Sequence, residues 1–117
     1  MNTKDFGNEG ENLASKYLIE KGYKILKRNY RYGKGEIDII AEIDNILVFV
    51  EVKTRANDTY GPAELAISRS KQKQIKKIAE LYLIENEIFD KDCRIDVVAI
   101  NYDKKSSYSL NHIINAF

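Results

Sequence analysis

The sequence predicts an α/β/α sandwich around a central mixed sheet of about five strands. Two segments carry apolar residues at helical spacing, and other segments are rich in strand-forming residues. A long helical segment also connects the third strand to the fourth, which is typical of a right-handed parallel crossover. We therefore expect the order α-β-β-β-α-β-β in a single domain over residues 1–117.

The first helix is expected over residues 3–21, with Gly22 as its terminator. Glu11 falls on the same stripe as Ala14 and Leu18, so its carboxylate is expected to point toward the protein. Gly10, inside the helix, costs up to about 1 kcal/mol of helix propensity relative to Ala, which favours a close approach of the backbone to a neighbour.

Three strands and a tight hairpin are expected next. Residues 23–32 are prone to form an outer strand, and a turn follows at 33–35. Two apolar runs, 35–43 and 46–55, lie on either side of Asp44-Asn45. These two residues tolerate positive φ and suit a two-residue hairpin turn.

The second half of the chain supplies a helix and two strands. A loop from residue 56 leads into a short helical piece over 63–67, and Ser70 is expected to cap the longer helix. Residues 93–100 alternate as a buried strand, with Arg94 and Asp96 on one face, and 108–114 form an edge strand. The inward face of the helix is expected to carry Ile75, Ile78, Ala79, Tyr82 and Leu83.

Composition excludes several classes of protein. The 117 residues are 44% hydrophobic and 32% charged, which is typical of a globular domain, and no apolar run is long enough to span a bilayer. No secretory signal pattern begins the chain, so we expect a cytoplasmic protein without a membrane partner. One cysteine and one histidine exclude a closed zinc site and argue against a histidine-activated nucleophile.

Basic residues gather in two blocks. Residues 21–34 hold six Lys or Arg, three Tyr and no acid, and residues 69–77 hold five Lys or Arg. Acids gather instead over 80–92. A basic region and an acidic region are therefore expected, although either basic block alone could be ordinary solvated surface.

The hairpin register brings two carboxylates together. With the turn at 44–45, one face of the two strands carries only apolar residues, including Ile37 opposite Val52. On the other face, Asp38 is expected opposite Glu51 as a non-hydrogen-bonded pair with Cα atoms about 4.5 Å apart. The same face pairs Glu36 with Lys53.

Two facing carboxylates repel by roughly 3–4 kcal/mol at ~4 Å and a dielectric constant of about 20. The single ammonium of Lys53 does not balance Glu36, Asp38 and Glu51, and Glu11 would add further negative charge. A divalent cation is the natural counter-charge. Oxygen ligands beside an ammonium favour Mg²⁺ or Mn²⁺ over zinc or copper.

A structural ion cluster is the alternative to a metal site. In that case Lys53, Arg94 and Lys71 would neutralise the acids without chemistry. Glu11 could also turn to solvent or pair with a basic residue. Lys71 and Gln74 could lie at a phosphate-binding helix N-terminus or form ordinary first-turn surface.

Five stretches of sequence carry a resemblance to a known family: GNEGENLA at 7–14, GEIDIIA at 35–41, VFVEVKTR at 48–55, KQKQIKKIAELYL at 71–83 and RIDVVAI at 94–100. In that order they are similar to the YraN-like family of small, predicted endonucleases. Asp38 followed by Glu51-Val52-Lys53 also resembles the signature of the PD-(D/E)XK nuclease superfamily, the restriction-endonuclease-like fold that includes Holliday junction resolvases. Ile37 stands where the superfamily name places Pro, a position without a chemical role.

The resemblance implies a role for each site residue. Asp38, Glu51 and the backbone carbonyl of Val52 would hold Mg²⁺, and Glu11 matches a helix-borne Glu that resolvase-like relatives add to the metal site. Lys53 would orient the attacking hydroxide or stabilise charge on the phosphate. The metal would lower the pKa of its water and polarise the phosphodiester.

These observations lead to the hypothesis of a Mg²⁺- or Mn²⁺-dependent endonuclease that recognises the shape of DNA, such as junctions, flaps or ends. Analogy with resolvases implies a homodimer. The alternative is a nucleic-acid-binding or assembly module that keeps the fold without turnover. The candidate nucleic-acid contacts are Arg31, Lys34, Arg55, Lys71, Gln74 and Arg94.

Overall fold

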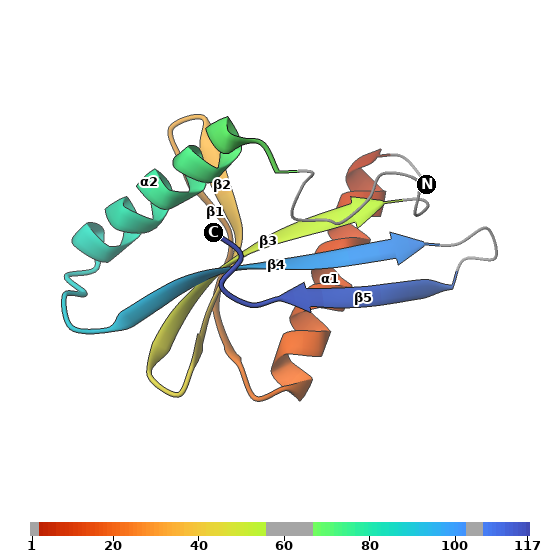
Figure 1. The fold of residues 1–117 in the computed structure, drawn as a ribbon, viewed down its shortest axis with the longest axis horizontal. Helices are drawn as coiled ribbons and strands as arrows, with labels where there is room; N and C mark the ends of the chain where they lie inside the picture. Colours follow the sequence, from red (N-terminus) through yellow and green to blue (C-terminus); the bar gives the residue numbers. More distant parts are fainter. Residues whose placement is uncertain (1–2, 56–66, 103–106) are drawn as a thin grey trace.

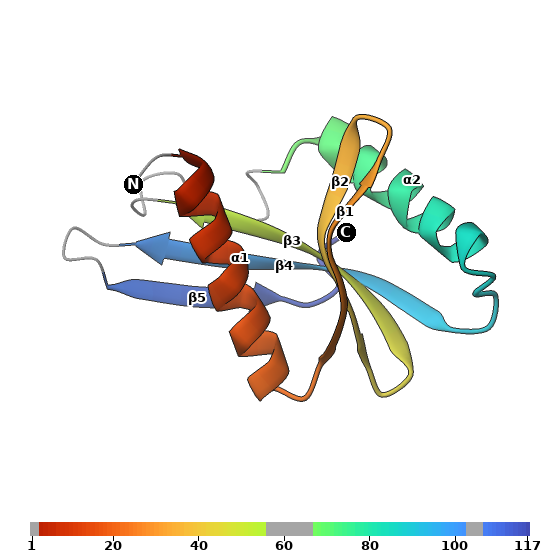
Figure 2. The ribbon, with the colours of Figure 1, turned by 180° about the vertical axis from the view of Figure 1, so that it is seen from behind.

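A five-stranded sheet forms the centre of the computed structural model, which describes residues 3–55, 67–102 and 107–117. Helices α1 (Thr3–Glu20) and α2 (Arg69–Glu85) lie on opposite faces of the sheet (Figures 1 and 2). β3 and β4 are parallel, and the other neighbours are antiparallel. The predicted sandwich and element order are confirmed. In sheet order the strands are β1 (Lys24–Tyr32), β2 (Gly35–Ile43), β3 (Ile46–Arg55), β4 (Asp92–Tyr102) and β5 (Tyr108–Ile113).

Each face of the sheet has its own apolar core. Ala14 and Leu18 of α1 pack on one face, and Ile75, Ile78 and Tyr82 of α2 pack on the other. Both helices are amphipathic, which is why one stripe of each is buried and the rest is polar. Within the described segments, neither helix combines the length and the apolar character needed to cross a membrane.

The β2–β3 hairpin has the predicted turn. Asp44 and Asn45 both adopt positive φ, at 48° and 63°, as the favoured two-residue turn requires. The ladder pairs Ile43 with Ile46 and continues to Ile39 opposite Val50 in the predicted register. The alternation of apolar residues therefore fixed the pairing correctly near the turn.

The predicted cap of α2 is wrong by two residues. Ser68, in extended conformation, is the N-cap and accepts a hydrogen bond from Lys71 N–H at 3.1 Å. Ser70 lies inside the first turn, because the hydroxyl that precedes the helix by the right spacing is that of Ser68. The short helical piece predicted over 63–67 lies outside the described residues, except for Ile67, which is buried.

α1 approaches β3 closely at Gly10. A Cβ atom at this position would overlap Thr54 Oγ1 and lie 3.5 Å from Thr54 Cβ. The glycine predicted to mark a close backbone approach therefore does so against β3. The neighbouring residue Glu11 reaches the sheet because α1 lies this close.

Gly10→Ala is expected to destabilise the protein by about 1–3 kcal/mol, because the added methyl group overpacks against Thr54. The double variant Gly10→Ala/Thr54→Ala should recover most of this loss, since it removes the clashing hydroxyl. Chemical denaturation of the two single variants and the double variant measures the coupling. Equal stability of Gly10→Ala and wild type would contradict the close approach.

Candidate active site

The β2–β3 ladder ends where the acidic residues begin. Backbone pairing stops at Ile39 and Val50, and beyond it the Val52 N–H donates to Asp38 Oδ2 at 2.8 Å. At this level the β1–β2 hairpin bends away from β3 (Figure 1). Asp38 and Glu51 thus lie where the two strands β2 and β3 diverge, and this place is called the fork.

The fork corrects the predicted register at the open end of the hairpin. Ile37 packs with the α2-side core, whereas Val52 packs with the α1-side core. Ile37 therefore faces the side of the sheet opposite to the one that regular alternation predicts. The Asp38 side chain accepts the Val52 N–H, and Ile37 gains apolar burial against α2. The ladder lacks three predicted pairs: Asp38–Glu51, Glu36–Lys53 and Ile37–Val52.

Burial and like charge raise the pKa of both fork acids. Desolvation is the largest cause for Asp38, and the Glu51 carboxylate adds to it, so the pKa of Asp38 rises to about 8 although the Val52 N–H opposes the rise. Desolvation also raises the pKa of Glu51, against the opposing effect of Lys71 and Lys53. Near neutral pH the fork therefore retains a proton unless a cation replaces it.

α1 brings a third carboxylate to the fork. Glu11 is buried and its side chain contacts Asp38; desolvation raises the pKa of Glu11, and Arg28 lowers it. Arg28 Nη2 lies 3.9 Å from Glu11 Oε2. The Asn29 amide, with its nitrogen toward Glu11, donates to Oε1 at 2.9 Å. The structure therefore places Glu11 beside Asp38, as predicted, and β1 holds it there.

Sequence reasoning missed both β1 residues that hold Glu11. Arg28 was one member of a basic block and had no assigned partner. Asn29 adopts φ 54° in the middle of β1, a conformation that Asn tolerates better than most residues. An Asn inside a strand was the available signal for an irregularity at this level of the sheet.

Two lysines from different elements act on Glu51. Lys71, in the first turn of α2, lowers the pKa of Glu51 more than Lys53 of β3 does. Gln74, one turn further along α2, is exposed, and its side chain lies against Gly35 at the start of β2. α2 therefore contributes positive charge to the fork through Lys71.

Arg94 does not lie with the fork acids. It is ion-paired with Asp96 at 3.0 Å and donates to the Tyr23 hydroxyl. Asp96 is fully buried and also receives hydrogen bonds from His112 and the Asn115 N–H. The prediction that Arg94 could neutralise Asp38 and Glu51 is wrong, because Asp96 supplies the nearer carboxylate on the same face of β4.

The remaining predicted contacts lie on β1, in the turn between β1 and β2, and at the end of β3. The Arg31 side chain is 78% exposed and pairs with Glu36 at 3.1 Å. Lys34 lies in the exposed turn between β1 and β2. Arg55 ends β3 and is half-buried opposite Asn101 of β4. Their role in nucleic-acid binding stays a prediction.

The donor set of the fork fits Mg²⁺ or Mn²⁺. Among the described residues, no three Asp, Glu, His or Cys side chains gather into a ready cluster. Mg²⁺, however, is usually bound through one or two carboxylates and keeps several waters. Asp38 and Glu51 supply two half-buried carboxylates, and the charge of Glu51 raises the pKa of Asp38; the Val52 carbonyl and Glu11 lie beside them. A divalent cation would relieve this repulsion.

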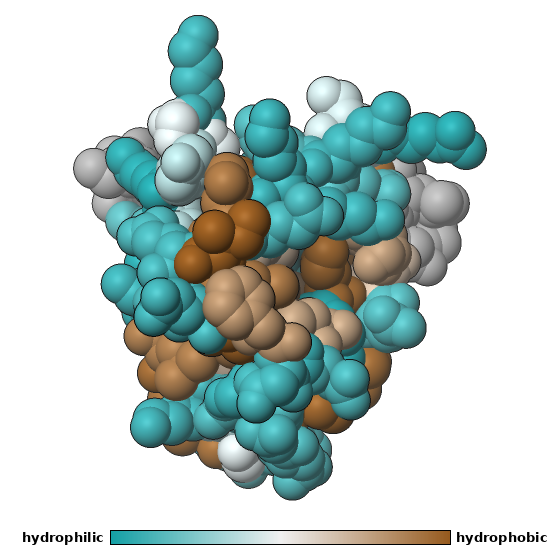
Figure 3. Space-filling model, turned by 90° about the vertical axis from the view of Figure 1, so that its left-hand side faces the viewer, coloured by the Kyte–Doolittle hydropathy of each residue, from teal (hydrophilic) through white to brown (hydrophobic). Residues whose placement is uncertain are grey.

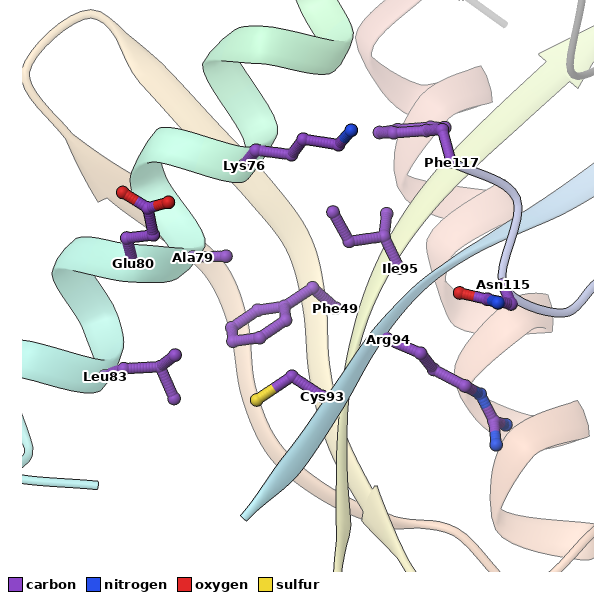
Figure 4. A pocket seen from close by; sticks show the side chains of 10 residues that line it. All are labelled: Phe49, Lys76, Ala79, Glu80, Leu83, Cys93, Arg94, Ile95, Asn115 and Phe117. Atoms are coloured by element: carbon purple, nitrogen blue, oxygen red, sulfur yellow. The ribbon is translucent and has the colours of Figure 1, made fainter. Parts of the chain in front are cut away.

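A separate cavity of about 260 Å³ lies between the second half of α2 and β4. Figure 4 shows Leu83 and Phe49 directed into it, with Lys76 beside Phe117 at its rim. Figure 3 shows apolar surface on the side of the molecule where α2 ends. None of the fork residues lines this cavity. The two fork acids therefore lie outside this cavity.

The family model and the relatives that match this chain carry the same family description. The model of a family described as "Uncharacterised protein family UPF0102" matches residues 10–100. A UPF0102 protein of Thermodesulfovibrio yellowstonii is 49% identical over 113 residues, covering 97% of this chain and 96% of the relative. A UPF0102 protein of Pelobacter propionicus is 45% identical over 113 residues, covering 95% of this chain and 81% of the relative.

Among solved structures, that of Pyrococcus furiosus SfsA in complex with Ca²⁺ is similar to this chain. The TM-score is 0.39 and the sequence identity 18%. The match covers 97% of this chain and 64% of the other, so this chain spans less than two thirds of that protein.

Proposed function

The chain belongs to the uncharacterised protein family UPF0102, and we propose that it is a metal-dependent endonuclease of the PD-(D/E)XK superfamily. One observation carries the proposal. Asp38 and Glu51 lie half-buried at the fork, and desolvation raises the pKa of both. Such an arrangement is costly for a fold unless a cation uses it, and perturbed carboxylates in this setting are typical of functional sites.

Each residue of the fork would have its own role in phosphodiester hydrolysis. Asp38, Glu51 and the Val52 carbonyl would hold Mg²⁺ or Mn²⁺, with Glu11 as a further carboxylate. When bound, the metal would supply a water of lowered pKa and positive charge near the phosphate. Lys53 would stabilise negative charge that develops on the phosphate oxygens, which is the dominant need in this reaction.

Positive side chains at the fork and on the neighbouring elements favour nucleic acid as the substrate. Lys71, Lys34 and Arg31 come from separate elements, so they could contact phosphates on more than one side of a scissile bond. Contacts to phosphates position a strand without reading its sequence. We therefore propose selection by DNA shape, such as junctions, flaps or ends.

The test is cleavage of labelled branched, flapped, linear double-stranded and single-stranded DNA with Mg²⁺ or Mn²⁺. Asp38→Asn and Lys53→Ala are each expected to lower the rate about 100-fold or more, because each removes a charge used at the reacting phosphate. Gel analysis of the products under single-turnover conditions measures the rate.

Two matched controls keep the assay specific. Asp44→Asn makes the same chemical change as Asp38→Asn in the exposed hairpin turn, and Lys16→Ala removes a lysine on the exposed side of α1. Both should cleave like wild type. If wild type cleaves none of these substrates faster than Asp38→Asn does, the nuclease proposal fails for them. DNA binding that survives in such an inactive protein would instead support a binding module.

A further inference from the structure

A groove of about 270 Å³ lies between the β1–β2 turn and α2. Figures 1 and 2 both show this turn beside the N-terminal half of α2. Ile78 and Leu81 of α2 provide apolar lining, and Gly35 closes the strand side. A Cβ atom at Gly35 would lie 2.5 Å from Ile78 Cδ1. The groove therefore depends on the absence of a side chain at position 35.

The rim of the groove combines positive charge with an aromatic ring. Lys34 lies on the turn and Lys77 on α2, and none of the described lining residues carries a carboxylate. The Tyr32 side chain, at the end of β1, is 48% exposed. An exposed aromatic ring in the same groove as lysines is an arrangement that binds single-stranded nucleic acid, with a base stacked on the ring and phosphates beside the cations.

The groove continues toward the fork along two elements. Gln74 lines the groove and is one helical turn from Lys71, which acts on Glu51. Three residues of helix span about 4.5 Å. On the strand side, Gly35 precedes Glu36, whose charge acts on Glu51. A strand that passes through the groove would thus run toward the fork.

We propose that this groove holds an unpaired nucleotide next to the scissile phosphodiester, with its base on Tyr32 and its phosphate between Lys34 and Lys77. The location of the scissile bond rests on the proposed function. A base inside a duplex is stacked and cannot enter a groove between a helix and a turn unless it leaves the helix. The groove therefore selects a strand with an unpaired base at this position.

The test measures binding separately from cleavage. In an Asp38→Asn background, fluorescence anisotropy gives the affinity for a single-stranded oligonucleotide and for a duplex of the same sequence. Tyr32→Leu is expected to weaken single-strand binding about 5- to 50-fold, as loss of one stacked base does, with little effect on the duplex. Tyr32→Phe should retain the affinity, because the ring remains.

Tyr108→Leu is the matched control, since Tyr108 is 50% exposed but lies on β5. It should leave single-strand binding unchanged. Lys77→Gln should reduce the salt dependence of single-strand binding by about 0.7 in the slope of log K against log salt, whereas Lys16→Gln should not. A 2-aminopurine base in the strand should be quenched by the protein and should lose this quenching in Tyr32→Leu.

Unchanged single-strand affinity and unchanged quenching in Tyr32→Leu would contradict the proposal that the groove holds an unpaired nucleotide, even if wild type cleaves DNA. An equal loss in Tyr108→Leu would overturn it as well. Loss of stacking in Tyr32→Leu but not in Tyr108→Leu would support nucleotide binding in the groove, even if wild type cleaves no substrate. Failure of the groove and failure of the nuclease proposal are therefore separate outcomes.

Discussion

Asp38→Asn is expected to stabilise the metal-free protein by up to about 4 kcal/mol at pH 7, because pH 7 lies about three units above the ordinary pKa of 3.8 and each unit corresponds to about 1.4 kcal/mol. The carboxylate of Asp38 is half-buried beside Glu51, and its pKa rises from 3.8 to about 8. Asn carries no charge, and its side-chain oxygen can still accept the hydrogen bond from the Val52 N–H. The substitution therefore removes the repulsion and keeps the contact.

The gain should depend on pH with a defined sign. Between pH 3.8 and about 8, folded Asp38 holds a proton that the unfolded chain has released. The contribution of Asp38 is therefore lost as pH rises through this window, and wild-type stability falls relative to Asp38→Asn. Urea unfolding in a chelating buffer at several pH values should show similar stabilities near pH 4 and the largest difference above pH 8.

Asp96→Asn is the matched comparison and should have the opposite sign. Desolvation raises the pKa of Asp96, but hydrogen bonds from His112, Arg94 and the Asn115 N–H outweigh it and hold the pKa below its usual value. Removing this carboxylate leaves Arg94 without its buried partner, so a loss of about 2–4 kcal/mol is expected. Loss of stability in Asp38→Asn at pH 8 would contradict the electrostatic description of the fork.

Mg²⁺ or Mn²⁺ is expected to stabilise wild type by about 2.7 kcal/mol at a concentration 100-fold above its dissociation constant. Because the metal must displace the proton from Asp38, the apparent affinity should increase with pH up to about 8. Binding at pH 7 should release about one proton per metal ion. Thermal unfolding and calorimetry in two buffers of different ionisation enthalpy measure both effects.

Glu51→Gln keeps the size of the side chain but removes one ligand charge, so its response to metal should be small. Asp44→Asn, in the hairpin turn, should respond like wild type. Equal responses from wild type and Glu51→Gln would exclude the fork as the metal site. Binding without proton release at pH 7 would contradict the raised pKa of Asp38.

Sequence patterns predicted the parts of the fold that depend on local spacing. The Asp44-Asn45 turn and the apolar alternation from Ile39 to Val50 were sufficient to give the register of the hairpin. The acids of the fork were found because charged residues interrupted this pattern. Element order followed from the long helix between β3 and β4, which required a parallel connection.

The geometry at the open end of the hairpin was not predictable from alternation. A regular ladder would place Ile37 beside Val52, but the two residues belong to opposite cores. At this point the Asp38 side chain takes the place of a backbone acceptor for the Val52 N–H, and Asn29 on the neighbouring strand has a positive φ. Both depend on tertiary packing with α1 and α2, which spacing along one strand does not encode.

The locality of the hairpin has a consequence for the order of folding. Asp38 and the Val52 amide are only 14 residues apart, so a hairpin that closes on the microsecond timescale can bring the two acids together early. Lys71 and Arg28, which moderate the charge of Glu51 and Glu11, come from elements outside this hairpin. A nascent chain would therefore experience the repulsion before the opposing charges arrive, and a divalent cation could act on the folding barrier as well as on the finished site.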